Sequence, residues 1–394
     1  MENFKYCMPT TVFFGKGEFE RIRKAASATG KKALIVIGKG AVKKFGYLQK
    51  LESFLKMDGI SYEVFEGIEP NPRSTTINSA GEQAHKMKAD MIIALGGGSV
   101  MDAAKGVAIV AMTGHDVWDY CSTKNKKAKK VIEALPLICI PTLAATGSEV
   151  DGASVITNPM TKQKAVMHSG VLVPKYAVID PLLTLTAPKD YVIDGAVDII
   201  CHCLETYLSC NNPHVTIPDN VTLAITRSVK TATEDFIENP KNVEARETLS
   251  WASSMAMMGL FSGRCGGWPI HEIEHAMSGL YDISHGLGLA LLLPAVLEFD
   301  KAHNEKKIMR FVGYFLHENT SHYTSCEEAI HHFKKWLQQI EAIRDPKKHG
   351  MEKVDMEAVA KMALDIYGHE GGYIFGVVPM YKEDIISVLK NAIA

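Results

Sequence analysis

The first half of the chain alternates short apolar runs, rich in β-branched residues, with segments of helical pattern. The apolar runs are KALIVIGKG (31–39), SYEVFEG (61–67), ADMIIALGGGS (89–99), PLICIPT (136–142) and YAVIDP (176–181). Parallel strands are joined by crossover segments, which are usually helices. The alternation therefore predicts a parallel sheet with helices on both faces.

After about Leu185 the pattern becomes mostly helical. In 327–343 the apolar residues recur at helical spacing, and Ser325 with Glu328 is typical of a capping box. Three further ranges have the same pattern: 219–238, 243–261 and 353–367. A chain of 394 residues is longer than one core usually supports. We expect an α/β nucleotide-binding domain at 1–184, an all-α metal-binding domain at 185–394, and an active site in the cleft between them.

The composition points to a small-molecule partner. With 43 Lys and Arg against 45 Asp and Glu, the net charge is -2, which provides no basic face for nucleic acid. The longest apolar runs, LGLALLLPAVLEF and VAIVAM, are shorter than the roughly 20 residues that cross a membrane. The 8 cysteines are scattered and the N-terminus lacks signal-peptide features, so we expect reduced thiols and a cytoplasmic protein.

A glycine-rich turn follows the third apolar run. There MIIAL leads into Gly96, Gly97, Gly98 and Ser99, and a helix is expected to start near Val100. Glycines allow close approach of an anion, and the amides of a helix N-terminus face it. The turn predicts a pyrophosphate site. Its spacing matches neither G-x-G-x-x-G nor a P-loop, so a tight turn without a ligand is the alternative.

A second turn of similar character is PTLAATGSE. It offers the hydroxyls of Thr142, Thr146 and Ser148 around Gly147. Such hydroxyls bond phosphate oxygens, although they also cap helices. Two turns of this kind in one sheet favour a bound dinucleotide.

The end of the first apolar run bears on the choice of coenzyme. It reads Gly38, Lys39, Gly40, with Lys43 and Lys44 one turn later, and no acid is present. A site selective for NAD usually has a carboxylate for the ribose 2′-hydroxyl, whereas a 2′-phosphate requires small residues and cations. The segment therefore predicts NADP(H) rather than NAD(H), unless these lysines are simply exposed.

Acids and imidazoles recur at one-turn spacing in two segments: Asp194, Asp198 and His202 in the first, His271 and His275 in the second. If both segments are helical, each set lies on one face, with about 6 Å of rise per step. His285 lies beyond a turn-like segment and has to return from another element. One carboxylate with up to three imidazoles suits catalytic zinc or ferrous iron. Spacing leaves two choices open, Asp194 or Asp198, and His275 or His285.

Seven stretches occur in an ordered series: PTTVFFGKGEFE, NPR (71–73), LGGGSVMDAAK, PTLAATGSEVD, VIDPLLTLTAP, GAVDIICHCLE and HEIEHAMSGLYDISHGLGLALLLP. In number and order they resemble the iron-containing alcohol dehydrogenase family, and within it the NADPH-dependent butanol dehydrogenases. The resemblance spans the chain from end to end and implies a dehydroquinate synthase-like architecture.

The resemblance also implies site residues. The implied metal ligands are Asp198, His202, His271 and His285, with His275 beside the site. The implied coenzyme contacts are Gly97, Gly98, Ser99 and Asp102 in the pyrophosphate loop, with Asn71, Thr142, Leu143, Thr146, Lys164 and Leu183 elsewhere. Relatives that use NAD carry an Asp where this chain has Gly38. Many relatives have a small residue in place of Asp194, so this second acid is expected to coordinate the metal or to bond one of its ligands.

The expected reaction is reversible hydride transfer between NADP(H) and a small primary alcohol or aldehyde such as butanol or butyraldehyde. The expected enzyme is a homodimer that holds Fe²⁺ or Zn²⁺, and His275 passes a proton to solvent or serves only in packing. The alternatives are a metal- and NAD-dependent cyclase or a polyol dehydrogenase of the same fold, and a nucleotide-binding regulator without turnover. A cyclase requires a sugar-phosphate pocket rich in Arg and Lys, whereas WASSMAMMGLFSG (251–263) beside Arg264 is largely apolar.

Overall fold

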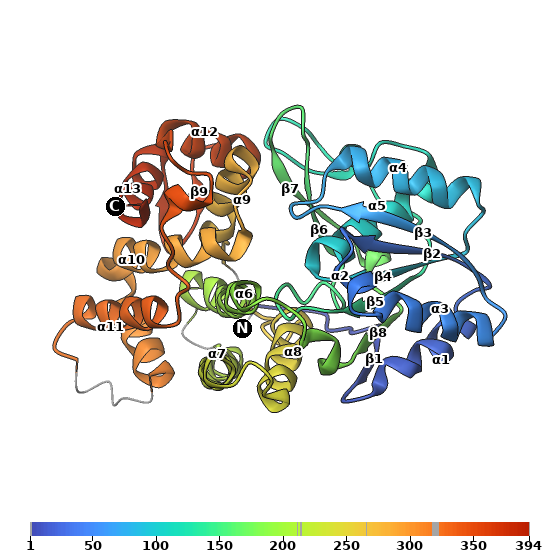
Figure 1. The fold of residues 1–394 in the computed structure, drawn as a ribbon. Helices are drawn as coiled ribbons and strands as arrows, with labels where there is room; N and C mark the ends of the chain where they lie inside the picture. The colour runs from blue at the N-terminus through green and yellow to red at the C-terminus, as the bar shows by residue number, and fades with distance from the viewer. Residues whose placement is uncertain (1, 211, 213–214, 265, 317–322, 394) are drawn as a thin grey trace. The chain divides into compact units, whose positions relative to one another are not determined.

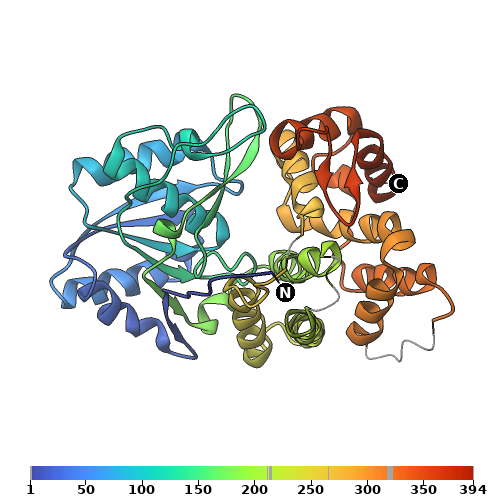
Figure 2. The same ribbon diagram turned by 180° about the vertical axis from the view of Figure 1, so that it is seen from behind.

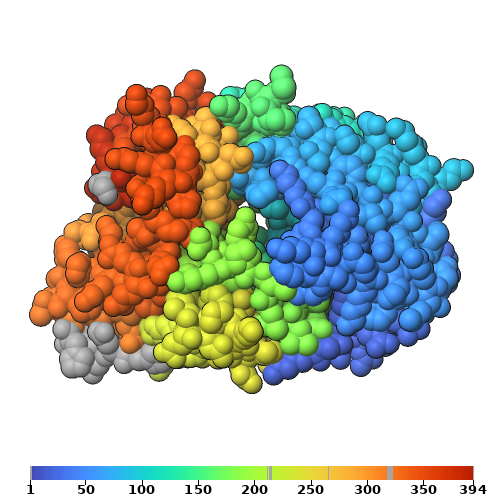
Figure 3. Space-filling model, viewed as in Figure 1, coloured from blue at the N-terminus to red at the C-terminus, as the bar shows by residue number. Residues whose placement is uncertain are grey.

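The computed structural model describes residues 2–210, 212, 215–264, 266–316 and 323–393. The chain forms two compact units, one of Met8–Ala187 and one of Met1–Cys7 with Pro188–Ala394. Figures 1 and 2 show an α/β unit, coloured blue to green, and a helical unit, coloured mostly green to red. Figure 3 shows the side chains of the two units in the same colours.

The α/β unit contains a six-stranded sheet in the order β1-β8-β5-β4-β2-β3, in which every neighbouring pair is parallel. Its strands are β1 (Thr11–Phe14), β2 (Lys32–Gly38), β3 (Ser61–Ile68), β4 (Met91–Gly96), β5 (Leu137–Pro141) and β8 (Tyr176–Ile179). The predicted parallel sheet is confirmed. Strand β1, a four-residue edge strand paired with β8, was not predicted from the sequence.

Helices cover both faces of this sheet. On one face lie α1 (Ile22–Ser27) and α3 (Tyr47–Met57), and on the other lie α4 (Ser74–Lys86) and α5 (Gly98–Thr113) (Figure 1). Because both faces are covered, consecutive residues of β2 from Ala33 to Ile37 are all buried. The short helix α2 (Ala41–Lys44) follows β2.

A β-hairpin packs against α5. It consists of β6 (Ala153–Thr157) and β7 (Lys164–His168), which pair antiparallel. No pattern in the sequence predicted this hairpin.

The second unit is helical, as expected. Its helices are α6 (Lys189–Ser209), α7 (Thr216–Glu238), α8 (Val243–Met257), α9 (Pro269–Tyr281), α10 (His285–Phe315), α11 (Cys326–Gln339), α12 (Met356–Tyr367) and α13 (Lys382–Ile393). Within the described ranges its strands are β9 (Ile374–Phe375) and β10 (Pro379–Met380), which are each two residues long and pair with each other. Ser325 caps α11 as predicted, since its Oγ accepts a hydrogen bond of 3.2 Å from Glu328 N.

Helix α6 positions the candidate site. It packs against α7, α8, α9 and α10, and almost all its residues from Val192 to Ser209 are buried. Buried charges are costly unless they are paired or bind a metal, yet α6 carries Asp194, Asp198 and Glu205 in the interior. Among the described residues, no helix is both long and apolar enough to span a membrane.

Candidate functional site

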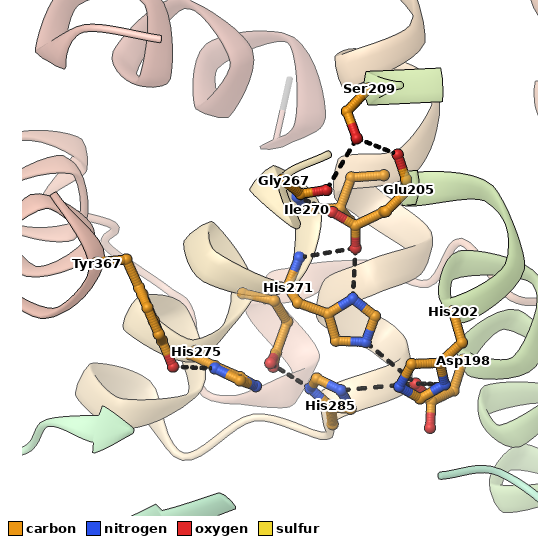
Figure 4. A network of polar contacts seen from close by, with 11 residues as sticks. Asp198, His202, Glu205, Ser209, Gly267, Ile270, His271, His275, His285 and Tyr367 are labelled. Carbon is orange, nitrogen blue, oxygen red and sulfur yellow. Dashed lines mark hydrogen bonds and ion pairs between the residues drawn. The ribbon is translucent and has the colours of Figure 1, made fainter. Parts of the chain in front are cut away.

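Three imidazoles converge on one carboxylate oxygen in the helical unit. Asp198 Oδ1 lies 3.4 Å from His202 Nδ1 on the same helix, 3.4 Å from His271 Nε2 of α9, and 3.7 Å from His285 Nε2 at the start of α10 (Figure 4). A tetrahedral ion bound at about 2.0 to 2.2 Å holds its ligand atoms about 3.3 to 3.6 Å apart. Asp198, His202 and His271 therefore have the spacing of a metal ligand set, and His285 Nε2 lies just beyond that spacing from Asp198 Oδ1.

The hydrogen bonding of these atoms supports the same interpretation. Within the described part of the chain, Asp198 Oδ1, His202 Nδ1 and His271 Nε2 are buried and make no hydrogen bond. Buried polar atoms are almost always hydrogen-bonded, so three unsatisfied atoms at one point require an explanation. A divalent cation satisfies all three at once.

A second layer of carboxylates orients two of the imidazoles. Glu205 Oε1 accepts from His271 Nδ1, and Glu274 Oε2 accepts from His285 Nδ1. Glu205 is itself fixed because its two oxygens accept from Ile270 N at 2.7 Å and from His271 N at 3.1 Å, in the first turn of α9. Carboxylates behind ligating histidines set the tautomer and raise ligand basicity. Here they leave both Nε2 atoms directed toward Asp198 (Figure 4).

The surroundings of the site favour, in two of the four side chains, the deprotonated state that binds a metal. Burial opposes ionisation of Asp198, but the three imidazoles hold the pKa of this carboxyl well below its usual range. Burial lowers the pKa of His202 to about 4, so this imidazole is neutral near pH 7. Burial also disfavours charge on His271, yet Glu205 and Asp198 together raise its pKa to about 10. A metal therefore has to displace a proton from His271.

A competing cluster lies beside this one. Ligand atoms of Glu274, His275 and His285 also lie within 4.8 Å of one another. Two contacts of this group are hydrogen bonds, since Glu274 bonds His285 and His275 Nδ1 lies 2.6 Å from Tyr367 Oη of α12. Among the described residues, the set around Asp198 brings three buried atoms without hydrogen bonds together, against one in this group, Glu274 Oε1, so it is the better candidate metal site.

Asp194 does not join either cluster. Its Oδ2 accepts from Ser284 Oγ at 2.5 Å and its Oδ1 accepts from Arg344 Nη2 at 2.5 Å. Ser284 precedes His285 at the N-terminus of α10. Asp194 thus bonds the residue next to a candidate ligand, and the structure places it in neither of the two expected roles, coordination of the metal or a hydrogen bond to one of its ligands.

In the α/β unit the two glycine- and hydroxyl-rich turns touch each other. Helix α5 starts at Gly98, two residues earlier than expected. A β-carbon at position 98 would lie 2.4 Å from Thr146 Cγ2, so in this arrangement the position accommodates only glycine. Both turns follow the carboxyl ends of adjacent strands, β4 and β5, where parallel sheets bind ligands. Gly97, Gly98 and Ser99 are therefore placed together with Thr142, Leu143 and Thr146.

Asp102 is hydrogen-bonded to the second turn and to strand β6. Its Oδ1 accepts from Ser148 Oγ at 2.6 Å and its Oδ2 accepts from Val155 N at 2.9 Å, and the side chain is buried. Lys105, fully buried, donates to Ser148 Oγ at 2.8 Å and to Asp151 Oδ1 at 2.6 Å. The two α5 residues therefore fasten the second turn and the β6–β7 hairpin to this helix.

The remaining predicted coenzyme residues are distributed over the same unit. Lys164 Nζ of β7 donates to Asn71 Oδ1 at 2.9 Å, so the structure brings these two buried residues together. Leu183 is 5 % exposed and belongs to the core beneath the sheet. Gly38 ends β2, Lys39 and Gly40 follow it, and Lys43 of α2 pairs with Glu66 of β3.

Sequence reasoning missed Glu205, Glu274 and Tyr367. Glu205 follows His202 by three positions on α6, and Glu274 follows His271 by three positions on α9. That helical spacing was a usable signal. Tyr367 lies 92 residues from His275 and gave no local signal.

Comparison with known proteins agrees with these features. A family model described as iron-containing alcohol dehydrogenase matches residues 9–181, and one described as the C-terminal part of the Fe-containing alcohol dehydrogenase family matches 192–393. NADH-dependent butanol dehydrogenase A of Clostridium acetobutylicum is 34% identical over 398 residues, which cover 100% of both chains. The NADPH-dependent aldehyde reductase YqhD of Escherichia coli is 32% identical over 79% of both chains.

Solved structures give the same result. The crystal structure of NADH-dependent butanol dehydrogenase A from Thermotoga maritima superposes with a TM-score of 0.90 at 32% identity, covering 100% of this chain and 99% of that one. The two family models together span both units, and full-length relatives are more than 30% identical to this chain. These matches assign the chain to a single family. The chain belongs to the iron-containing alcohol dehydrogenase family and is a metal-dependent oxidoreductase.

Proposed function

We infer that the protein reduces small aldehydes to primary alcohols, and catalyses the reverse oxidation, with a nicotinamide dinucleotide as hydride carrier. The observation that carries this proposal is the convergence of three imidazoles, those of His202, His271 and His285, within 3.7 Å of Asp198 Oδ1. Three of the four donor atoms are buried and make no hydrogen bond among the described residues. We assign these four residues as the metal ligands. Fe²⁺ is the proposed ion, supported by the family, and Zn²⁺ also suits this donor set.

The chemistry divides between the bound groups and the protein. A divalent cation at Asp198 supplies Lewis-acid polarisation of a carbonyl oxygen, and the coenzyme supplies the hydride. Glu205 and Glu274 hold the imidazoles of His271 and His285 in the ligand tautomer. No side-chain nucleophile is required.

His275 is proposed to carry the proton that the substrate oxygen gains or loses. Its ring stacks on His285 with centroids 5.5 Å apart, and its Nδ1 is bonded to Tyr367 Oη. The hydroxyl of Tyr367 both donates and accepts, so it can hold the proton at His275 Nδ1 or receive it. Histidine is suited to this transfer near neutral pH.

An uncharged substrate is favoured over a sugar phosphate. Arg264, the cation that a cyclase of this fold could use, is buried and donates to Asp219 Oδ1 and to Thr222 Oγ1, each at 2.9 Å. Its guanidinium also lies over the rings of Tyr207 and Phe261. Since this cation is bound within the protein, we propose a short-chain alcohol or aldehyde such as butanol or butyraldehyde, in line with the butanol dehydrogenases among the relatives.

The choice between NADP(H) and NAD(H) depends on the end of β2. The prediction of NADP(H) relied on the absence of an acid after Gly38. Relatives with either coenzyme in their names match this chain at 32% identity or more. We therefore propose that the pocket admits both dinucleotides and that the surroundings of Gly38 and Lys43 decide between them.

The test is coenzyme oxidation by anaerobically purified, metal-loaded protein with aldehydes of increasing chain length. We expect turnover with short aldehydes that is lost after chelation and returns with Fe²⁺. Undiminished turnover in metal-free protein, or no turnover with any aldehyde in the loaded protein, would contradict the proposal.

A further inference from the structure

The topology of the sheet defines where a dinucleotide reaches the end of β2. In the order β5-β4-β2-β3, the chain leaves β2 toward β3 on one side and leaves β4 toward β5 on the other. Ligands of open parallel sheets bind in the crevice at such a switch point, outside the carboxyl ends of the strands. A β-carbon on Gly38 would lie 3.7 Å from Val100 Cγ2, so the end of β2 is in contact with the first turn of α5.

An acid from the neighbouring strand stands at this place. Glu66 lies near the end of β3, opposite Ile37 of β2, and the register shifts between Ile37 and Gly38. Glu66 Oε1 lies 3.7 Å from the position of a β-carbon on Gly40. The acid that the β2 segment itself lacks is therefore supplied by β3.

This acid also holds the nearest lysine. Glu66 Oε2 accepts from Lys43 Nζ, and the side chains of both residues are 41% exposed. Lys43 was one of the cations, with Lys39 and Lys44, expected to attract a 2′-phosphate. In the structure its charge is paired with a carboxylate that would repel the same phosphate.

We propose that Glu66 is a specificity-determining residue for the coenzyme: its carboxylate accepts a hydrogen bond from the ribose 2′-hydroxyl of NAD(H) and, by holding Lys43, disfavours the 2′-phosphate of NADP(H). This inference rests on the proposed function and reverses the preference expected from the β2 segment alone. An exposed ion pair contributes little to stability, so a role in folding does not account for the pair.

The test compares kcat/KM for NADH and NADPH, with one aldehyde, in metal-loaded wild type, Glu66→Gln and Lys43→Gln. We expect Glu66→Gln to raise the NADPH to NADH ratio at least about tenfold, because repulsion is removed and Lys43 is released. Lys43→Gln should lower the ratio. The matched control is Glu63→Gln on the same strand, which loses the same charge but is bonded to Gln83 Nε2 at 2.8 Å, away from the strand end.

An unchanged ratio in Glu66→Gln, or an equal change in Glu63→Gln, would overturn the inference. If wild type turns over no aldehyde, the proposed function fails, and the inference is then decided by calorimetric titration of NAD⁺ and NADP⁺ into wild type and Glu66→Gln. In that experiment, the role of Glu66 is supported if NADP⁺ binds more tightly, relative to NAD⁺, in Glu66→Gln than in wild type. No shift, or no binding of either dinucleotide, contradicts it.

Discussion

At the scale of single residues, the buried carboxylates behind the imidazoles explain how the site is held. Replacing Glu205 with Gln preserves side-chain volume but removes the negative charge behind His271 Nδ1 and replaces one of the two accepting oxygens with an NH2 donor. We expect metal affinity to fall about 10- to 100-fold, measured by competition with a chelator. The control is Glu272→Gln: burial raises the pKa of Glu272 to about 8, so near pH 7 this change removes little charge. Equal metal affinity in Glu205→Gln and Glu272→Gln would contradict the assigned role.

Asp300 makes a second residue-scale prediction. It lies on α10, is 2% exposed, and its Oδ1 makes no hydrogen bond among the described residues. Burial, assisted by the charge of Glu205, raises its pKa to about 7. An acid with a raised pKa in the folded state stabilises the protein most below its unfolded pKa of about 3.9, and that stabilisation is lost as pH rises through 7.

Asp300→Asn should therefore be relatively more stable at pH 8 than at pH 5. The difference in the free energy of unfolding between Asp300→Asn and wild type is expected to change by on the order of 2 to 4 kcal/mol between these two pH values. Denaturant unfolding of the metal-free proteins measures it. The same difference at both pH values would show that Asp300 does not titrate in this range.

The limit of sequence reasoning at this scale is visible in the histidines. Their spacing placed Asp198 and His202 on one helix and His271 and His275 on another, as the structure has them. It left open which imidazoles face Asp198, because that depends on how α6, α9 and α10 pack. Such contacts join residues that are distant in sequence, and no local pattern encodes them.

At the scale of elements, the close approach of two turns gives a further prediction. Gly98→Ala would bring a methyl group against Thr146 and displace the loop after β5. We expect NAD⁺ or NADP⁺ to bind at least about tenfold more weakly, by calorimetric titration, because both turns lose their relative position. Gly170→Ala is the control, since nothing lies within 4 Å of its added β-carbon. Wild-type affinity in Gly98→Ala would argue against a pyrophosphate at these turns.

The elements themselves were predicted to different degrees. Strands with five or more apolar residues, such as β2 and β4, were evident because both faces of a parallel sheet are buried. Strand β1 and the β6–β7 hairpin were missed. Four residues at a sheet edge and a short hairpin carry too few apolar positions to stand out, and their pairing with β8 and with each other is decided by tertiary contacts.

At the scale of the whole molecule, the change from alternating to helical pattern indicated two units. The structure adds that Met1–Cys7 belongs with the helical unit rather than with the sheet that follows it. Glu2 N donates to Gly263 O at 3.0 Å, and the ring of Tyr6 lies 3.2 Å from the position of a β-carbon on Gly259. A backbone hydrogen bond across more than 250 positions leaves no trace in local composition.

The central claim, that one divalent cation is held by Asp198, His202, His271 and His285, is tested most directly by anaerobic Fe²⁺ titration of wild type, His285→Ala and His275→Ala. We predict one ion per chain in wild type, binding at least about tenfold weaker in His285→Ala, and near wild-type affinity in His275→Ala. His285 belongs to both candidate clusters, whereas His275 belongs only to the one with Glu274, so the affinity of His275→Ala separates the two. Loss of the ion in His275→Ala, or full binding in His285→Ala, would contradict the account.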